Sequence, residues 1–268
     1  MASKRQQAIR RRRIFIMCCV AVLALCIIAV SAIAVLIKNA IKNKDEAEPT
    51  LSVPQISSEV SEPVSSEPPS PAGLDPNYTN LLLVNGKNPL PQDYDYGGNL
   101  ITIEAKYHNG QLNQIDAQVW PYMKAMLEAA WEDGVDLKVW SPYRSYDTQQ
   151  MLFNNQVQRC INKGFVGADA ENEAATVVAR PGTSEHNTGL CADFNMASDT
   201  FETTPMYTWM CENAEDYGFI LRYPKDKIDI TGVIYESWHW RFVGIKTARE
   251  MNAMGVTLEE YVQHKSAQ

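Results

Sequence analysis

The hydrophobic pattern of the chain begins with an uninterrupted apolar run. Residues 14–37 carry no charge and are apolar apart from Ser31. At about 1.5 Å per residue, a helix of this length crosses the roughly 30 Å hydrocarbon core of a bilayer. The run is longer than the apolar part of a cleaved signal peptide, which is about 7–15 residues. It therefore predicts a retained transmembrane helix.

Beyond residue 78, the apolar positions follow the spacing of helices and short strands in turn. Between Asp116 and Asp133 they recur at helical spacing, and Gly134 follows as the closing residue. Further elements are expected as helices at 147–164, 171–179, 204–218 and 245–255, and as strands at 80–85, 135–140, 190–196 and 236–244. This alternation predicts one α+β domain.

Between these two parts, residues 45–74 are rich in Pro, Ser and Glu. So little apolar surface does not offset the entropy of ordering, and a disordered, extended tether is expected. With a Pro-rich rise of about 3.1 Å per residue, it would reach up to roughly 90 Å. The expected organisation is a basic cytoplasmic tail at 1–13, a transmembrane anchor at 14–37, a linker at 38–77 and a folded domain at 78–268.

The distribution of charge predicts an orientation in the membrane. Six positive residues precede the apolar run, and three lysines follow it closely. Because the side richer in Lys and Arg stays in the cytoplasm, the bulk of the chain is expected outside. Residues 45–268 hold 15 basic and 32 acidic residues, a balance of −17. Such a surface repels polyanions, so nucleic acid is not expected as a partner.

The cysteines do not indicate a disulfide framework. Three of the six fall in the apolar run, and Cys160, Cys191 and Cys211 lie beyond it. An odd number without CxxC spacing predicts neither a set of disulfides nor a zinc site built on thiolates. One disulfide pair stays open as an alternative.

The stretch "SEHNTGLCAD" at 184–193 places His186 and Asp193 seven residues apart, on either side of Gly189, in a chain with four histidines. In the strand that follows the glycine, alternation turns Asp193 away from the apolar face, together with Cys191. Gly189 permits the sharp turn that lets His186 approach from the preceding loop. Imidazole and carboxylate are zinc ligands, so a metal site is one interpretation. A surface or capping pair is the other.

A third ligand has to come from elsewhere in the chain. Of His108, His239 and His264, His239 lies in "ESWHW", with Glu236 three residues before it. This resembles the arrangement in metallopeptidases, in which one residue ligates the metal and a nearby carboxylate takes a proton from the bound water. On a flat strand Glu236 and His239 would point to opposite faces, so a bulge or loop is required there.

Each remaining signal is weak when taken alone. Trp238 and Trp240 have the character of core or pocket-wall residues. The segment "SPYRS" at 141–145 indicates a turn with a solvated arginine, and Gln149 a polar group exposed on a helix. Their joint occurrence in one order carries more weight than any of them singly.

In that order, the motifs resemble those of the VanY-type D-alanyl-D-alanine carboxypeptidases, zinc peptidases that trim bacterial cell-wall peptides. The resemblance covers roughly residues 78–262 and is carried by "LLVNGKNPLPQDY", "SPYRSYDTQQ", "ARPGTSEHNTGLCAD" and "ESWHWRFVG". It implies an α+β fold, a small antiparallel sheet flanked by helices, shared with the Hedgehog signalling domain. The chain departs from the family at Pro142, where Gly is usual, and at Cys191, where Ala is common. Neither departure removes a ligand.

The resemblance also implies roles for individual residues. One Zn²⁺ ion would be held by His186, Asp193 and His239, with Glu236 as the general base. Arg144 would bind the terminal carboxylate of the substrate, an anion that a guanidinium grips in a bidentate way. The expected lining of the substrate pocket comprises Gln149, Ser184 and Trp238.

These roles predict a membrane-anchored zinc carboxypeptidase in the cell membrane of a bacterium, with its catalytic domain outside. Its substrates would be peptidoglycan stem peptides, from which it would remove the terminal D-alanine. An L,D-carboxypeptidase acting on tetrapeptides with the same machinery is the nearest alternative. A non-catalytic wall-binding module stabilised by zinc is another, against which the presence of Glu236 argues, because a structural zinc needs no base.

Overall fold

The computed structural model describes residues 70–91, 93–95 and 97–267. The predicted basic tail, the predicted span at 14–37 and most of the predicted linker lie outside the described residues. Within the described ranges, no helix combines the length and the apolar character needed to cross a bilayer.

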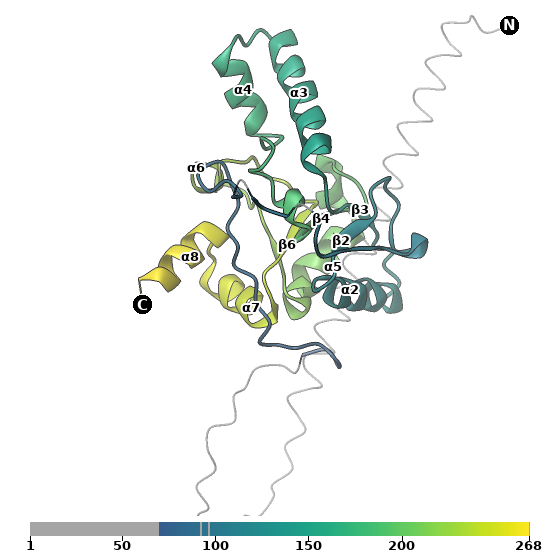
Figure 1. The fold of residues 1–268 in the computed structure, drawn as a ribbon. Coiled ribbons are helices and arrows are strands. Elements are labelled where there is room, and N and C mark those ends of the chain that lie inside the picture. Colours follow the sequence, from purple (N-terminus) through teal and green to yellow (C-terminus); the bar gives the residue numbers. More distant parts are fainter. Residues whose placement is uncertain (1–69, 92, 96, 268) are drawn as a thin grey trace, which may run out of the picture. The chain divides into compact units, whose positions relative to one another are not determined.

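A four-stranded antiparallel sheet lies at the centre of the described fold (Figure 1). Its strands, in spatial order, are β3 (Val139–Ser141), β4 (Cys191–Phe194), β6 (His239–Phe242) and β5 (Phe219–Leu221). A second, two-stranded sheet pairs β1 (Leu100–Thr102) with β2 (Gln114–Asp116). The predicted α+β class with a small antiparallel sheet is therefore confirmed.

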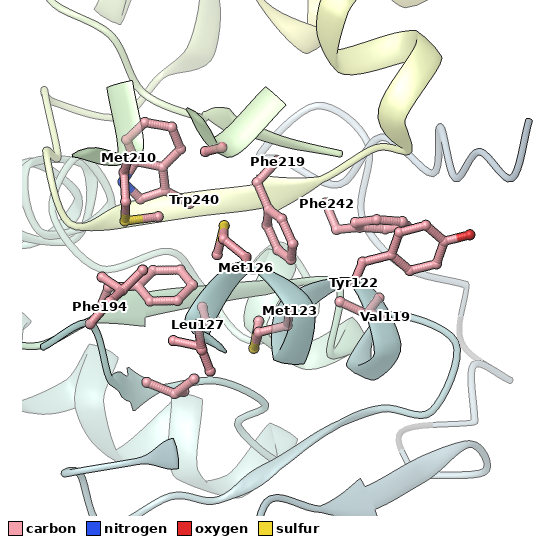
Figure 2. Close-up of a cluster of buried hydrophobic side chains, with 14 of the residues drawn as sticks. Val119, Tyr122, Met123, Met126, Leu127, Phe194, Met210, Phe219, Trp240 and Phe242 are labelled. Carbon is pink, nitrogen blue, oxygen red and sulfur yellow. The ribbon is translucent and has the colours of Figure 1, made fainter. Parts of the chain in front are cut away.

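One face of the central sheet carries the hydrophobic core. Phe194 of β4 and Trp240 and Phe242 of β6 pack there with the buried side of α2 (Trp120–Glu132), including Met126 (Figure 2). Each fully buried side chain of this size stabilises the fold by about 1.5–3 kcal/mol. The predicted alternation along β4 is confirmed, and the opposite face of β4 and β6 carries polar side chains.

The helices surround the sheet. Their bounds are α3 (Tyr146–Asn162), α4 (Ala168–Ala175), α5 (Pro205–Asn213), α6 (Ile228–Thr231), α7 (Ile245–Met254) and α8 (Leu258–Ser266). The predicted helix at 147–164 agrees with α3, which begins where the Ser145 side chain accepts a hydrogen bond from the Thr148 amide. Figure 1 shows α3 and α4 packed side by side and extending away from the sheet.

Several predicted boundaries were wrong. The helix expected from Asp116 begins at Trp120, because Asp116 ends β2 and its carboxylate accepts from the Gln118 amide. The strands were expected to be longer than the three or four residues that the sheet pairs. The helix expected at 171–179 ends at Ala175, after which Val177 and Val178 line a cavity.

The predicted strand at 80–85 was also wrong. Apart from an isolated bridge between Asn85 and Asn88, this segment pairs with no strand in the described part of the chain. Its carbonyl groups instead accept from a side chain, since Arg241 Nη2 donates to Leu82 at 2.8 Å. The apolar residues of the segment pack on α7 and α8 rather than in the sheet.

Candidate metal centre

A cavity of about 270 Å³ opens on the polar side of β4 and β6. The residues to which the family resemblance gave a role all line it, namely Arg144, Gln149, Ser184, His186, Asp193, Glu236, Trp238 and His239. They come from α3, from three connecting segments and from the strands β4 and β6, so the fold brings distant parts of the chain to one place.

The strand register and one tight turn position the two imidazoles and the carboxylate. Asp193 of β4 lies directly opposite His239 of β6. His186 lies in the 3-10 turn Glu185–Thr188, which Gly189 ends at a φ of 73°. A β-carbon on Gly189 would lie 2.9 Å from the Asp116 amide nitrogen, so both the backbone angle and the space require glycine. The expected turn at Gly189 is therefore confirmed.

The polar atoms of these three residues converge. Asp193 Oδ1 lies 3.0 Å from His239 Nδ1 and 3.4 Å from His186 Nε2. All three side chains are buried. Burial alone would raise the pKa of the Asp193 carboxyl, but His186 and Arg144 outweigh it and hold that pKa well below its usual range.

Cys191 adds a thiol to this group. It shares the polar face of β4 with Asp193, and the ligand atoms of His186, Cys191 and His239 lie within 4.8 Å of one another. The spacing of the cysteines excluded a site built on several thiolates, but it did not reveal that a single thiol would lie beside both imidazoles. The buried site thus offers two imidazoles, a carboxylate and a thiol as donors.

Glu236 reaches the same group from outside the strand. It lies just before the turn at Ser237 and Trp238, and its Oε2 is 3.9 Å from His239 Nδ1. The loop that this approach required is therefore present. Burial raises the pKa of the Glu236 carboxyl to about 7, against the opposing charge of His239.

Arg144 has a partner that the sequence did not predict. Its Nη2 donates to Asp193 Oδ2 at 2.6 Å, and its Nε donates to Ser141 Oγ at 2.9 Å. The Arg144 side chain is 16% exposed, compared with 2% for Asp193. The guanidinium therefore orients the carboxylate and at the same time forms part of the cavity wall.

Three further residues complete the wall. Gln149 is buried in α3 and not exposed; its Nε2 donates to the Ala179 carbonyl, and its Oε1 lacks a hydrogen-bond partner among the described residues. Ser184 is buried immediately before the 3-10 turn that carries His186. Trp238 is half-buried and also packs against the core.

Comparison with known proteins assigns the chain to a family. The family model described as VanY, D-alanyl-D-alanine carboxypeptidase, matches residues 112–245, which is half of the chain and contains every residue of the cavity wall named above. The chain belongs to the VanY family.

The similarity to individual VanY relatives extends over about two thirds of the chain. A D-alanyl-D-alanine carboxypeptidase of Enterococcus faecalis is 42% identical over 183 residues, which are 68% of this chain and 65% of that relative. The match thus spans slightly less than two thirds of the relative's length. The putative carboxypeptidase YodJ of Bacillus subtilis is 39% identical over 68% of this chain and 67% of its own.

Solved structures agree with the assignment to the VanY family. VanYB in complex with D-alanine-D-alanine is 41% identical with a TM-score of 0.59, covering 68% of this chain and 97% of that one. A VanY variant from a VanB-type resistance cassette, in complex with Zn(II), is 41% identical with a TM-score of 0.58 and coverages of 68% and 98%. The LdcB LD-carboxypeptidase is 36% identical with a TM-score of 0.59 and coverages of 68% and 84%.

The residues of this VanY protein fit a zinc ion on their own chemistry. Imidazole nitrogen, carboxylate oxygen and thiolate sulfur are the donors that zinc takes in proteins. In catalytic sites three of them bind the ion and a fourth position stays open. Here the donors are buried, and His186, Asp193 and His239 line the cavity, so a bound ion would be reached from the cavity side.

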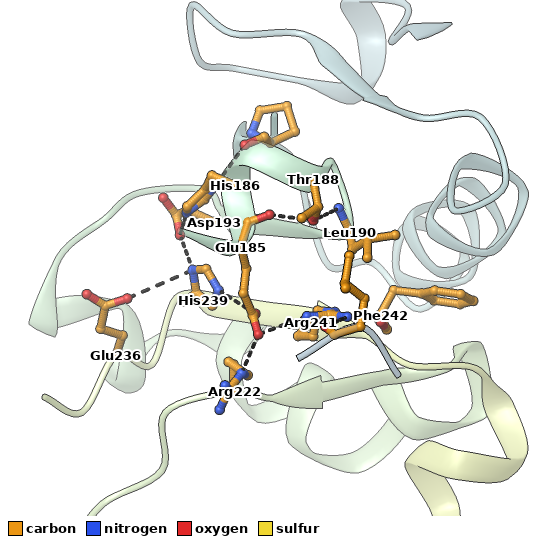
Figure 3. Close-up of polar contacts among 12 residues, drawn as sticks. Glu185, His186, Thr188, Leu190, Asp193, Arg222, Glu236, His239, Arg241 and Phe242 are labelled. Atoms are coloured by element: carbon orange, nitrogen blue, oxygen red, sulfur yellow. Dashed lines mark hydrogen bonds and ion pairs between the residues drawn. The ribbon is translucent and has the colours of Figure 1, made fainter. Parts of the chain in front are cut away.

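The sequence missed a second set of residues around the centre. The ring centroids of Tyr223 and His239 lie 4.9 Å apart, and Tyr223 forms part of the cavity wall. Glu185 is buried beside His239, between Arg222 and Arg241 (Figure 3). Arg241 was detectable, since a charged residue two positions after His239 on a buried strand needs a buried acidic partner. Arg222 had no comparable signal.

Proposed function

We propose that this protein is a zinc-dependent D,D-carboxypeptidase that removes the C-terminal D-alanine from peptidoglycan stem peptides. The observation that carries the proposal is the convergence of His186, Asp193 and His239 beside Glu236 and Arg144 on one cavity. Membership of the VanY family and the named activities of its relatives support it.

His186, Asp193 and His239 would hold the zinc ion. When bound, zinc supplies a Lewis acid for the scissile carbonyl group and for the attacking water. The burial of the three ligands keeps competing water away and strengthens every charge interaction within the site.

Glu236 would be the general base. Its Oε2 faces the ligand cluster, where it can take a proton from the attacking water and pass that proton to the departing amine of D-alanine. Burial raises the pKa of this carboxyl above its usual value, which favours both proton transfers near neutral pH.

Arg144 and Gln149 would position the substrate. One Nη2 hydrogen bond of Arg144 is used on Asp193, which leaves N–H groups of the same guanidinium to donate to the terminal carboxylate. Such a contact favours a free chain end and therefore cleavage of the last bond only. The buried Oε1 of Gln149 would accept from a peptide N–H group, which would satisfy an atom that otherwise lacks a partner.

The test is product analysis on defined stem peptides with the full chain. A pentapeptide ending in D-Ala-D-Ala is expected to lose one D-alanine, and Glu236→Gln should keep zinc while abolishing this release. Cleavage of tetrapeptides alone would support the L,D-carboxypeptidase, an activity named for the related LdcB structure. Zinc binding by the wild type without any cleavage would support the wall-binding module.

We also propose that residues 14–37 hold the enzyme at the outer face of the cell membrane. The support is the sequence: an uncharged apolar run preceded by six positive residues. The full chain should stay with membranes in alkaline carbonate and be released only by detergent. Release by carbonate would refute an integral anchor.

A further inference from the structure

Two buried polar atoms face each other behind the candidate metal centre. Glu185 Oε2 and His239 Nε2 both lack a hydrogen-bond partner among the described residues, although each side chain is almost fully buried. They lie 3.7 Å apart. A buried polar atom left without a partner costs about 1–3 kcal/mol. A small approach would satisfy both atoms with one hydrogen bond, donated by Nε2–H to Oε2.

Arginines fix the orientation of the Glu185 carboxylate. Its Oε1 accepts from Arg222 Nε at 2.7 Å and from Arg241 Nη1 at 2.8 Å, and both guanidinium groups are fully buried (Figure 3). Arg222 is itself held by both oxygens of Glu259 in α8, at 2.6 and 2.9 Å. Because two donors occupy Oε1, Oε2 is the oxygen that faces His239.

The two histidines present opposite nitrogens to the centre. His186 has its Nδ1 2.7 Å from the Pro142 carbonyl, which can only accept, so the proton is on Nδ1 and Nε2 faces Asp193. His239 has its Nδ1 3.0 Å from Asp193 and its Nε2 directed at Glu185. An imidazole ligates a metal through the nitrogen that carries no proton, and the partner of the other nitrogen decides which one that is.

We propose that Glu185 is a positioning residue that keeps the proton of His239 on Nε2, so that Nδ1 offers its lone pair to zinc. The inference rests on the proposed zinc site. Glu185 acts through His239 and has no contact with the cavity, whose lining does not include it. It plays for His239 the part that the Pro142 carbonyl plays for His186.

The substitution Glu185→Gln separates this role from packing, because it changes little but the donor pattern. The amide has one oxygen and one NH₂ group, and the two guanidinium groups require the oxygen. The NH₂ group then faces His239 Nε2 and can only donate to it. Nε2 must therefore accept with its lone pair, so the ring proton moves to Nδ1. Loss of a partner of this kind typically weakens metal affinity about 10–100-fold. We expect that loss for Glu185→Gln.

The matched control is Glu259→Gln. It disturbs the same buried network at its other end, since Glu259 pairs with Arg222 and not with His239. It should lower the midpoint of urea unfolding about as much as Glu185→Gln, but leave the zinc dissociation constant unchanged. An equal loss of zinc affinity in both variants would show that Glu185 acts only through stability, and would overturn the proposal.

Two measurements on the full chain test it: the zinc dissociation constant, by competition with a chromogenic chelator, and the histidine tautomers, by ¹⁵N NMR of histidine-labelled protein. Zinc-loaded wild type should show His239 protonated at Nε2, a result that needs no variant to fold. A proton on Nδ1, or unchanged zinc affinity in Glu185→Gln, overturns the role of Glu185. Wild type that binds no zinc overturns the proposed function, and the role of Glu185 with it.

Discussion

Asp193 serves two sets of neighbours with its two oxygens. Oδ1 lies between His186 Nε2 and His239 Nδ1, whereas Oδ2 accepts from Arg144. Asp193 can therefore give Oδ1 to a cation without releasing the guanidinium. Since Arg144 both holds the proposed ligand Asp193 and lines the cavity, its loss should affect zinc affinity as well as substrate binding.

Cys191 poses a question of ligand identity, because its thiol lies as close to the imidazoles as a third ligand would. If Asp193 is the ligand, Cys191→Ala should keep stoichiometric zinc and D-alanine release within about threefold, because one protein ligand fewer leaves the open position that catalysis needs. Asp193→Ala should lose both. Zinc content by atomic absorption, with release assays, distinguishes them; zinc lost from Cys191→Ala but kept by Asp193→Ala would make the thiol the ligand.

The pH profile of kcat/KM should report Glu236. Its pKa, raised by burial to about 7, lies above the value of an exposed carboxyl, so the base form is lost as pH falls through that range. The rate should therefore rise with pH up to about 7. Because the positive charge of bound zinc favours the ionised carboxylate, the midpoint of this rise should lie below pH 7. Rates between pH 5 and 8 check this, with Glu236→Gln as a control that should show no such rise. A rate that falls over pH 5–7 contradicts the assignment.

At the scale of elements, the turn that presents His186 depends on Gly189. Gly189→Ala combines a left-handed φ of 73° with a contact of 2.9 Å to the Asp116 backbone. A non-glycine residue at such an angle costs about 1–3 kcal/mol, and the close contact adds to that. The expected result is a clear loss of unfolding free energy in urea and weaker zinc binding.

Gly255→Ala is the matched control for this turn. Gly255 has a φ of 65°, but a β-carbon there meets nothing within 4 Å. It should carry the backbone strain alone, about 1–2 kcal/mol, with zinc affinity unchanged. If the two variants lost equal stability and both bound zinc normally, close packing of Gly189 would have no part in forming the site.

Element types were predictable where a local signal was strong. The helix expected at 147–164 agrees with α3, and alternation along β4 correctly separated Phe194 from Asp193. The apolar run at 80–85 was wrongly predicted as a strand, because a strand also needs a neighbour to pair with and no strand of the described residues pairs with it. The sequence analysis did not predict α8, because most residues of this helix are polar. The capping box that Thr257 and Glu260 form would have indicated its start.

The site was predictable only in part, for a physical reason. Residue types and order indicated which side chains to expect together, but the register that sets Asp193 opposite His239 depends on pairing between strands far apart in the chain. The contact from Arg144 to Asp193 and the Glu185 network arise only once those strands have paired. Such contacts leave no regular spacing in the sequence from which they could be predicted.

At the scale of the whole molecule, buried charges tie the C-terminal helix to the centre. Arg222 bridges Glu259 of α8 and Glu185 beside His239. Burial alone would raise the pKa of the Glu185 carboxyl, but Arg222 and Arg241 outweigh it and hold that pKa well below its usual range. Removing one partner from a buried pair costs about 3–5 kcal/mol, so the network links the stability of the fold to the geometry of the site.

Zinc should therefore stabilise the entire folded domain, because its donors come from β4, β6 and the turn before β4 and meet only in the native state. An ion that binds only the folded state at 100 times its dissociation constant adds about 2.7 kcal/mol. For a domain of this size that corresponds to a rise in Tm of roughly 5–10 °C. Thermal unfolding with zinc and with excess chelator measures the difference, and Asp193→Ala should show almost none. An identical Tm for the wild type in both conditions would mean that the buried donors do not bind zinc as a folded unit.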